Sequence, residues 1–239
     1  MAKEIFSRTA MILGDEALSK LASARVAVFG IGGVGSFVTE ALARAGVGTL
    51  DLIDSDKVAA SNINRQLVAL HSTIGLYKTE VAAARIKDIN PDAVVNEYRC
   101  FYLPDEEEKF PFAEYDYIVD AVDTVTAKIG LCEAGKRYNV PVISIMGTGN
   151  KINPAMFEVS DIYKTSVCPL AKVMRRELKK RGITSLKCVY SKEIPLEHVA
   201  GDPEDARTPG SVSFNPPVAG MIAASEVIKD ITGIRNPEG

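Results

Sequence analysis

The first 150 residues alternate short hydrophobic runs with amphipathic segments. Alternating or continuous apolar runs bounded by Gly or Asp are typical of strands, and they occur at Arg25–Gly30, Thr49–Ile53, Ala93–Tyr98, Tyr115–Asp120 and Val140–Met146. The first of these, Arg25–Gly30, is expected to be buried. Between these runs, apolar residues recur at helical spacing in Val34–Ala45, Thr79–Ile89 and Thr124–Tyr138. This alternation predicts an α/β fold, a Rossmann-like doubly wound sheet that is mainly parallel and covered by helices on both faces.

The pattern changes after Asn150. Two short strands are predicted, at Pro154–Val159 and Lys187–Ser191. A basic helix with proline at its first position is predicted at Pro169–Arg181, and an apolar helix at Val218–Ile231. The polar segment Pro195–Gly210 is rich in Pro and Asp, which predicts a mobile loop. Since no internal repeat is present, we expect one domain, with residues 1–150 as its core and residues 151–239 as an extension packed on that core.

Composition narrows the class of protein. The chain has 239 residues, of which 46% are hydrophobic and 25% are charged, as in an ordinary globular domain. No apolar run approaches the roughly 20 residues that a membrane-spanning helix needs. Charges interrupt the apolar residues at the N-terminus too often for a secretory signal, so we expect a cytosolic protein. The 4 cysteines are scattered without CxxC spacing and only 2 histidines are present, which argues against a structural zinc site.

Charge is distributed unevenly. Residues 1–120 carry 12 Lys/Arg and 18 Asp/Glu, whereas residues 121–239 carry 16 and 13, so the net charge changes from −6 to +3. Within Ile162–Lys192 there are 9 basic residues and 1 acidic residue, Glu177. A basic segment on an acidic protein is typical of a site for a polyanion.

A glycine-rich turn follows the first predicted strand and opens the first helix. Gly30, Gly32 and Gly35 occupy the GxGxxG positions, and Gly33 adds a fourth glycine. Without Cβ atoms, such a turn can bring its N–H groups and the helix N-terminus against phosphate oxygens. Asp54 closes the second strand, at the spacing of a carboxylate that accepts from ribose hydroxyls. The turn therefore predicts a nucleotide site.

Residues downstream of the turn favour a triphosphate over a dinucleotide. Arg65 and Lys78 bring two cations to the edge of the sheet where the strands end, and these would neutralise β- and γ-phosphates. Asp123 lies just past another strand, and a carboxylate near a triphosphate is best explained as a ligand of Mg²⁺. We therefore predict ATP and magnesium. An NAD-dependent oxidoreductase remains an alternative, but it gives these three residues no role.

The order of motifs resembles the ThiF/MoeB/HesA superfamily of adenylating enzymes, the relatives of ubiquitin-activating enzymes. The motifs are GxGGxG, LIDxD, SNINRQ, GxxK and DAVDT, and with the N-terminal segment they span residues 8–150. The resemblance implies that Asp54 and Asp56 of LIDxD lie at the nucleotide, with Asp54 on the ribose. It implies that Asn62, Arg65, Gln66 and Lys78 contact phosphates and that Asp123 binds magnesium. It also implies a homodimer, in which Arg8 reaches the γ-phosphate in the partner subunit.

The C-terminal part resembles a narrower group, the tRNA threonylcarbamoyladenosine dehydratases. The residues concerned are CPLAKVMRRELKKRGI (168–183), KCVYSKEIP (187–195) and PGSVSFNPPVAGMIAASEVIKDI (209–231). Members of this group use ATP to activate the carboxylate of threonylcarbamoyladenosine, next to the anticodon of tRNA, and then cyclise it. The implied activity is that of an adenylate-forming ligase releasing pyrophosphate and AMP. The alternative is an enzyme that adenylates a ubiquitin-like sulfur-carrier protein, and a sulfur-relay protein remains a conceivable partner in either case.

The basic helix fits a tRNA substrate. Four cations fall at i, i+3, i+4 and i+7, so they are expected to share one face, at Lys172, Arg175, Arg176 and Lys179. Leu170, Met174 and Leu178 are expected to form the opposite, apolar face. With the family resemblance, this face is the predicted tRNA-binding surface, although a solvated amphipathic helix would show the same pattern.

Overall fold

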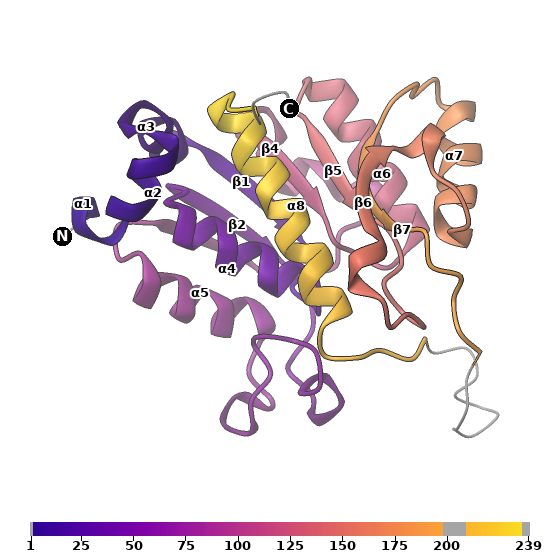
Figure 1. Ribbon diagram of the computed structural model, residues 1–239, viewed down its shortest axis with the longest axis horizontal. Coiled ribbons are helices and arrows are strands. Elements are labelled where there is room, and N and C mark those ends of the chain that lie inside the picture. The colour runs from indigo at the N-terminus through magenta and orange to yellow at the C-terminus, as the bar shows by residue number, and fades with distance from the viewer. Residues whose placement is uncertain (1, 198–208, 236–239) are drawn as a thin grey trace.

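One seven-stranded sheet organises the chain. The computed structural model describes residues 2–197 and 209–235. The strand order is β3-β2-β1-β4-β5-β7-β6, and all neighbours are parallel except β6 and β7. The strands are β1 Arg25–Phe29, β2 Thr49–Ile53, β3 Val94–Tyr98, β4 Tyr117–Asp120, β5 Val142–Ile145, β6 Phe157–Asp161 and β7 Lys187–Ser191. The predicted doubly wound, mainly parallel sheet is confirmed (Figure 1).

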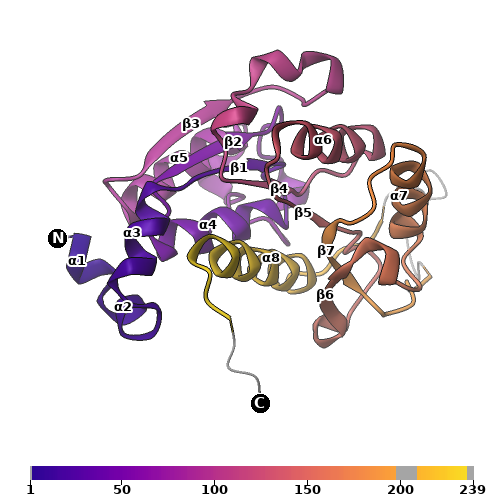
Figure 2. The same ribbon diagram turned by 90° about the horizontal axis from the view of Figure 1, so that it is seen from above.

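Helices cover both faces of the sheet. Figure 2 shows α6 above the sheet, α4 and α8 below it, and α7 beyond the β7 side. The α-helices are α1 Ala2–Ile5, α2 Ser7–Leu13, α3 Asp15–Ser23, α4 Gly35–Ala45, α5 Lys78–Ile89, α6 Val125–Tyr138, α7 Pro169–Lys180 and α8 Asn215–Thr232. Short 3-10 helices lie at η1 Ala60–Asn62, η2 His71–Thr73, η3 Pro104–Lys109, η4 Phe112–Glu114, η5 Pro154–Met156 and η6 Ile162–Lys164. Within the described ranges, no helix combines the length and apolar character needed to span a bilayer.

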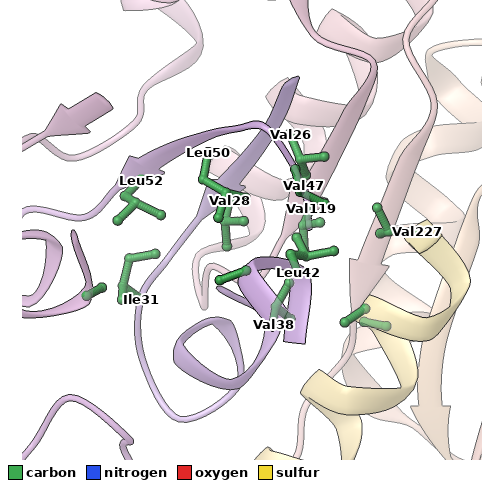
Figure 3. Packing of buried hydrophobic residues seen from close by; sticks show 14 of the residues in the cluster. Val26, Val28, Ile31, Val38, Leu42, Val47, Leu50, Leu52, Val119 and Val227 are labelled. Carbon is green, nitrogen blue, oxygen red and sulfur yellow. The ribbon is translucent and has the colours of Figure 1, made fainter. Parts of the chain in front are cut away.

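The main core lies between the sheet and the layer of α4 and α8. Val28, Leu50 and Val119 from three strands meet Leu42 of α4 and Val227 of α8 (Figure 3). All five are fully buried, and burying a side chain of this size contributes about 1.5–3 kcal/mol. This layer fixes α4 against the sheet, and thereby the glycine turn from which α4 begins.

Two further clusters complete the opposite face. Phe29, Tyr102, Phe110 and Phe112 form an aromatic cluster beneath α6, with Phe29 and Phe112 stacked at 5.9 Å between ring centroids. A third cluster joins α6, α7 and β7, and its buried members include Met174 and Leu178 of α7. The amphipathic helix predicted near residue 170 is thus anchored by its apolar side.

The structure differs from the sequence prediction at several boundaries. The three N-terminal helices were not predicted, and their apolar residues Met11 and Ile12 are each 84% exposed rather than forming an inward stripe. Strand β6 begins at Phe157, because Pro154 starts the 3-10 helix η5. Helix α8 begins at Asn215, earlier than expected, since prolines are tolerated in the first turn of a helix. The predicted loop Pro195–Gly210 lies mostly outside the described residues.

Parallel strands bring distant residues to one edge of the sheet. β1, β2, β4 and β5 run in the same direction, so their carboxyl ends lie together. The glycine turn follows β1, Asp54 follows β2, Asp123 follows β4 and Gly147 follows β5. Ligands of open α/β sheets bind outside such carboxyl ends, which makes this edge the candidate site.

Candidate active site

The glycine turn contains glycines of two kinds. At Gly35 an added Cβ would lie 1.7 Å from the Gly30 carbonyl oxygen, and at Gly30 it would lie 2.6 Å from the Ala121 carbonyl oxygen. Gly30 also has a φ of +88°, which favours glycine. These two residues are glycine because the turn itself is packed backbone against backbone.

Gly32 is different. The nearest atom to a Cβ placed on Gly32 would be Gln66 Nε2, at 3.8 Å, and the backbone of Gly32 has no positive φ. Nothing in the described protein therefore requires glycine here. The Gly32 carbonyl accepts from the Ser36 N–H at 3.1 Å, so this residue lies at the start of α4. A ligand approaching the helix N-terminus would explain the missing side chain, and the turn fits a nucleotide phosphate.

Asp54 holds the turn in place. Its carboxylate accepts from the Ile31 N–H at 2.7 Å and from the Asp56 N–H at 2.8 Å. Burial raises the pKa of Asp54 above its ordinary value, and the positive charge of Lys78 opposes that shift. A carboxylate can accept about four hydrogen bonds, so Asp54 retains capacity for a ribose hydroxyl. Its predicted role on the ribose remains a prediction.

Lys78 and Asp56 form an ion pair at 2.7 Å. The Lys78 side chain is only 7% exposed, whereas that of Asp56 is 65% exposed. Lys78 begins α5, and its N–H donates to the Asp56 carbonyl at 3.0 Å, which ties the helix to the end of β2. A bound phosphate would compete with the Asp56 carboxylate for the ammonium of Lys78.

The polar residues of the segment SNINRQ differ from one another in burial and in hydrogen bonding. Asn62 Oδ1 accepts from the Ala59 N–H at 3.1 Å and thus stabilises η1. Arg65 is half-buried, and its guanidinium donates to the Ser61 carbonyl at 2.9 Å. Gln66 is 8% exposed and lies beside Gly32. The three predicted phosphate contacts therefore lie in one loop that borders the glycine turn.

Two buried amides beside the turn have polar atoms without a partner among the described residues. In the described residues, no group bonds to Gln66 Oε1 or to either polar atom of the fully buried Asn215. Asn215 begins α8, and the next residue, Pro216, would lie 3.1 Å from a Cβ placed on Gly33. A buried unsatisfied group costs about 1–3 kcal/mol, which a ligand or an ordered water would offset. These unpartnered amide atoms are therefore consistent with a ligand-binding site beside the turn.

Asp123 lies three residues past β4 and is exposed. Behind it, the fully buried Asp120 accepts from the Lys128 ammonium at 3.1 Å on both carboxylate oxygens. Lys128 also donates to the Ile145 carbonyl at 2.7 Å, so this ion pair joins the ends of β4 and β5. Asp120 also accepts from the Val122 N–H at 3.3 Å, so the buried pair fixes the residue that precedes Asp123.

The described residues hold no cluster of three or more Asp, Glu, His or Cys that could bind a metal by themselves. Mg²⁺ is usually bound by one or two carboxylates together with substrate phosphates and water. The single carboxylate of Asp123 at a phosphate-binding edge fits that mode of binding. The predicted role of Asp123 remains a prediction.

Arg8 lies far from the glycine turn of its own chain. It is exposed on α2, and the neighbouring Phe6 ring lies 3.4 Å from a Cβ placed on Gly46, at the C-terminal end of α4. The turn lies at the other end of this 11-residue helix, about 16 Å away at 1.5 Å per residue. Arg8 is therefore not part of the site formed by its own chain.

Residues 209–214 form a strap along the site. Gly210 donates to Asn150 Oδ1 at 2.6 Å, and its carbonyl accepts from the Asn150 N–H at 2.8 Å. One residue later, the Ser211 carbonyl accepts from Asn64 Nδ2 at 3.0 Å. The strap thus connects the loop after β5 to the SNINRQ loop and then enters α8 (Figure 1).

The basic residues of α7 do not all project together. Lys172, Arg176 and Lys179 are exposed, but Arg175 is half-buried. Its guanidinium donates to the Thr165 carbonyl at 3.1 Å and also bonds to Thr165 Oγ1. Because η6 packs along that side of α7, the expectation of four cations on one free face is wrong for Arg175.

Two further details of α7 differ from the prediction. Arg176 pairs with Glu177 at 3.0 Å, and that carboxylate also binds Lys180 and Arg181. The side buried against the sheet consists of Ala171, Met174 and Leu178, whereas Leu170 is half-buried. The segment still presents a surface rich in exposed cations.

Sequence reasoning missed several polar residues of this edge. Lys128 gave no signal, because it occurs in a helical pattern in which a polar residue is normally taken as solvated, and Asn215 lies before the predicted helix Val218–Ile231. Lys151, in the loop after β5, is also buried. Only the packing of α6, α8 and the strap shows that these side chains point inward.

Comparison with known proteins agrees with this geometry. The profile of the ThiF family matches residues 6–239. The tRNA threonylcarbamoyladenosine dehydratase of Bacillus subtilis is 42% identical over 238 residues, which cover 95% of this chain and 94% of the relative. An adenylyltransferase and sulfurtransferase of Aspergillus clavatus is 33% identical over only 55% of this chain and 27% of its own length.

A solved structure is similar over almost the whole fold. The crystal structure of Escherichia coli tRNA N6-threonylcarbamoyladenosine dehydratase in complex with ATP superposes with a TM-score of 0.88 at 35% identity, covering 97% of this chain and 95% of that one. Its complex with AMP gives a TM-score of 0.89. The chain therefore belongs to the ThiF family, and within it to the tRNA threonylcarbamoyladenosine dehydratases.

Proposed function

We propose that this protein is an ATP-dependent ligase that cyclises N6-threonylcarbamoyladenosine in tRNA through a carboxylate adenylate. The observation that carries the proposal is the carboxyl edge of the sheet. There, Gly32 has room beside it, Arg65 lies next to Gly33, Lys78 pairs with Asp56, and Asp123 follows β4. The ATP and AMP complexes of the Escherichia coli relative support the binding of a nucleotide.

The chemistry follows from this arrangement. A carboxylate becomes reactive when one of its oxygens attacks the α-phosphate of ATP and expels pyrophosphate. Arg65 and Lys78 would stabilise the negative charge that develops on the leaving pyrophosphate, with Asn62 and Gln66 orienting the phosphates. An internal nucleophile of the modified base then closes the ring and releases AMP. Because this second step is intramolecular, proximity supplies much of its rate.

Magnesium would act in the first step. Asp123 would hold the ion, whose positive charge would reduce the repulsion between the phosphates and the incoming carboxylate. Asp54 would hold the ribose while keeping the turn closed, and Asp56 would exchange its ion pair with Lys78 for a place beside the nucleotide. Arg8 would complete the site from the partner subunit of a homodimer, because it lies at the wrong end of α4 to reach its own site.

The substrate would bind along α7. Lys172, Arg176 and Lys179 are exposed, and neutralised tRNA phosphates contribute a large share of affinity in such complexes. In this proposal residues 1–150 bind the nucleotide, while residues 151–239 bind tRNA and contribute to the dimer contact. An enzyme that acts on tRNA would work in the cytoplasm.

The test is pyrophosphate release by the purified protein with ATP and one of two acceptors. With tRNA that carries threonylcarbamoyladenosine, we expect pyrophosphate, AMP and cyclised tRNA, because only that tRNA supplies the carboxylate. With the same tRNA lacking the modification, we expect background release. Turnover that requires a ubiquitin-like or sulfur-relay protein instead of the modified tRNA would replace this function with the sulfur-carrier alternative.

A further inference from the structure

Lys151 is a buried lysine to which neither the fold nor the nucleotide site gives a role. It lies in the loop between β5 and η5 and is 3% exposed. Its ammonium donates to the Gly147 carbonyl at 2.6 Å. In the described part of the chain, no carboxylate forms an ion pair with it, unlike the buried Lys128, which has Asp120.

Such surroundings favour the neutral amine. A buried ammonium needs compensating charge or several acceptors, and Lys151 has one backbone carbonyl. Burial lowers the pKa of Lys151 below its ordinary value. The titratable groups that face it are the Cys168 thiol and the Glu193 carboxylate, and both oppose that shift. The Glu193 carboxylate is already bonded to the N–H groups of Ile152 and Asn153, at 2.9 Å each.

The position of Lys151 connects the two halves of the candidate site. On one side, Gly147 follows β5 at the edge where Asp123 follows the neighbouring strand β4. On the other side, Cys168 is the residue that begins the turn into α7, whose exposed cations are the proposed tRNA surface. A modified base held by α7, with its carboxyl group at the α-phosphate, would pass over the loop that holds Lys151.

Ring closure requires a proton acceptor beside the reacting group. The threonylcarbamoyl group contains a ureido unit, whose oxygen or nitrogen bonds to the acyl carbon while the bond from that carbon to the AMP oxygen breaks. In either case one N–H proton leaves the ureido unit, and AMP departs with the electron pair of the broken bond. We propose that the Lys151 amine accepts this proton and so acts as the general base of ring closure. The proposal rests on the proposed function, because it concerns the second step of that reaction.

The test separates the two steps by single turnover with modified tRNA and ATP labelled in its α-phosphate. In Lys151→Met, we expect the burst of pyrophosphate to remain, while cyclised tRNA forms about 100-fold more slowly or less, the usual contribution of a general base. Lys151→Arg should behave like Lys151→Met, because a permanently charged guanidinium cannot accept the proton. The control is Lys192→Met, which removes an exposed lysine paired with Glu158 from the same region and should cyclise normally.

The pH dependence of the unmodified enzyme provides a second readout, which does not depend on a variant that folds. Since the neutral amine is the working form, the rate of cyclisation should rise with pH and level off below the ordinary pKa of lysine. The pyrophosphate burst measured in the same samples corrects for effects on the first step.

Three results would overturn the proposal. The first is normal cyclisation in Lys151→Arg, and the second is a cyclisation rate that stays flat or falls with pH. The third is equal loss of the pyrophosphate burst and of cyclisation in variants that keep their melting temperature, because Lys151 would then serve the first step. If modified tRNA produces no pyrophosphate with the unmodified enzyme, it is the proposed function that fails.

Discussion

Gly32 and Gly35 belong to one turn, yet they are glycine for different reasons. An alanine Cβ at Gly35 would lie 1.7 Å from a backbone oxygen, so the turn would have to open. At Gly32 the same atom would make only an ordinary van der Waals contact, 3.8 Å from its nearest neighbour. The motif thus combines one position that serves the fold with another that serves a ligand.

We therefore expect Gly32→Ala and Gly35→Ala to separate stability from binding. Gly35→Ala should lower the free energy of unfolding by about 3 kcal/mol, as overpacking of a tight contact does. Gly32→Ala should change it by less than about 1 kcal/mol but weaken ATP binding by about tenfold or more, because its methyl group occupies the space of a phosphate. Chemical denaturation and calorimetric titration with ATP measure the two effects. Unchanged ATP affinity in Gly32→Ala would remove the phosphate from this position.

Asp123 allows a second test at the scale of single residues. It is exposed, and the fold is held by Asp120 and Lys128 behind it, so Asp123→Ala should leave the melting temperature within a few degrees of that of the parent. Pyrophosphate release should be abolished, since the proposed magnesium ligand is removed, while tRNA binding should persist. Asp123→Asn is the matched variant that keeps the shape. Near-normal turnover in both variants, measured over a magnesium series, would contradict the assignment.

At the scale of elements, sequence patterns predict those strands and helices whose hydrophobic residues recur at a regular spacing. The strands and the helices of the core were predicted to within a few residues, because buried runs and amphipathic segments carry their own period. Helix α7 shows that the spacing does not predict contacts between one element and another. Its spacing placed Arg175 among the free cations, but the spacing contains no information about η6, whose neighbour Thr165 binds the guanidinium. The inward direction of Lys151 and Asn215 likewise depends on segments that are distant in sequence.

The exposure of each cation of α7 indicates which substitutions test the proposed tRNA surface. Lys172 and Lys179 are exposed, so reversing both to Glu should weaken tRNA binding and reduce the slope of log affinity against log salt by about 2, since each phosphate that is no longer neutralised accounts for roughly 0.9. ATP affinity should stay constant. The control is Lys87→Glu, an exposed lysine on α5 that is remote from α7 in the fold (Figure 1). Filter binding over a salt series makes the comparison.

Arg175→Glu should behave differently from those reversals. Its guanidinium bonds to Thr165 and Ile162, so the expected effect is a loss of stability at the junction of η6 and α7 rather than a change in the salt slope. An unchanged slope after Lys172 and Lys179 are reversed, with tRNA affinity intact, would move the tRNA surface away from α7.

At the scale of the whole molecule, the fold of a single chain explains neither the exposed apolar residues of the N-terminal helices nor the position of Arg8. The N-terminal helices expose Met11 and Ile12, and Arg8 beside them lies at the end of α4 opposite to its own nucleotide edge. The proposed homodimer, in which Arg8 would enter the site of the partner, would account for both features. The sequence alone could not show that Arg8 is remote from its own site, since that follows from how α2 packs at the end of α4.

A shared site predicts complementation between two inactive proteins. Arg8→Ala and Asp123→Ala should each be inactive alone, one lacking the γ-phosphate contact and the other lacking the proposed magnesium ligand. After subunit exchange, half of the dimers are mixed, and one of the two sites in each mixed dimer has Asp123 from its own chain and Arg8 from the other. The mixture should therefore recover about a quarter of the parental activity, as a two-fold symmetric interface requires. Mass spectrometry of differently tagged subunits would verify the exchange. If mixed dimers are present but pyrophosphate release stays at background, Arg8 does not act across the interface.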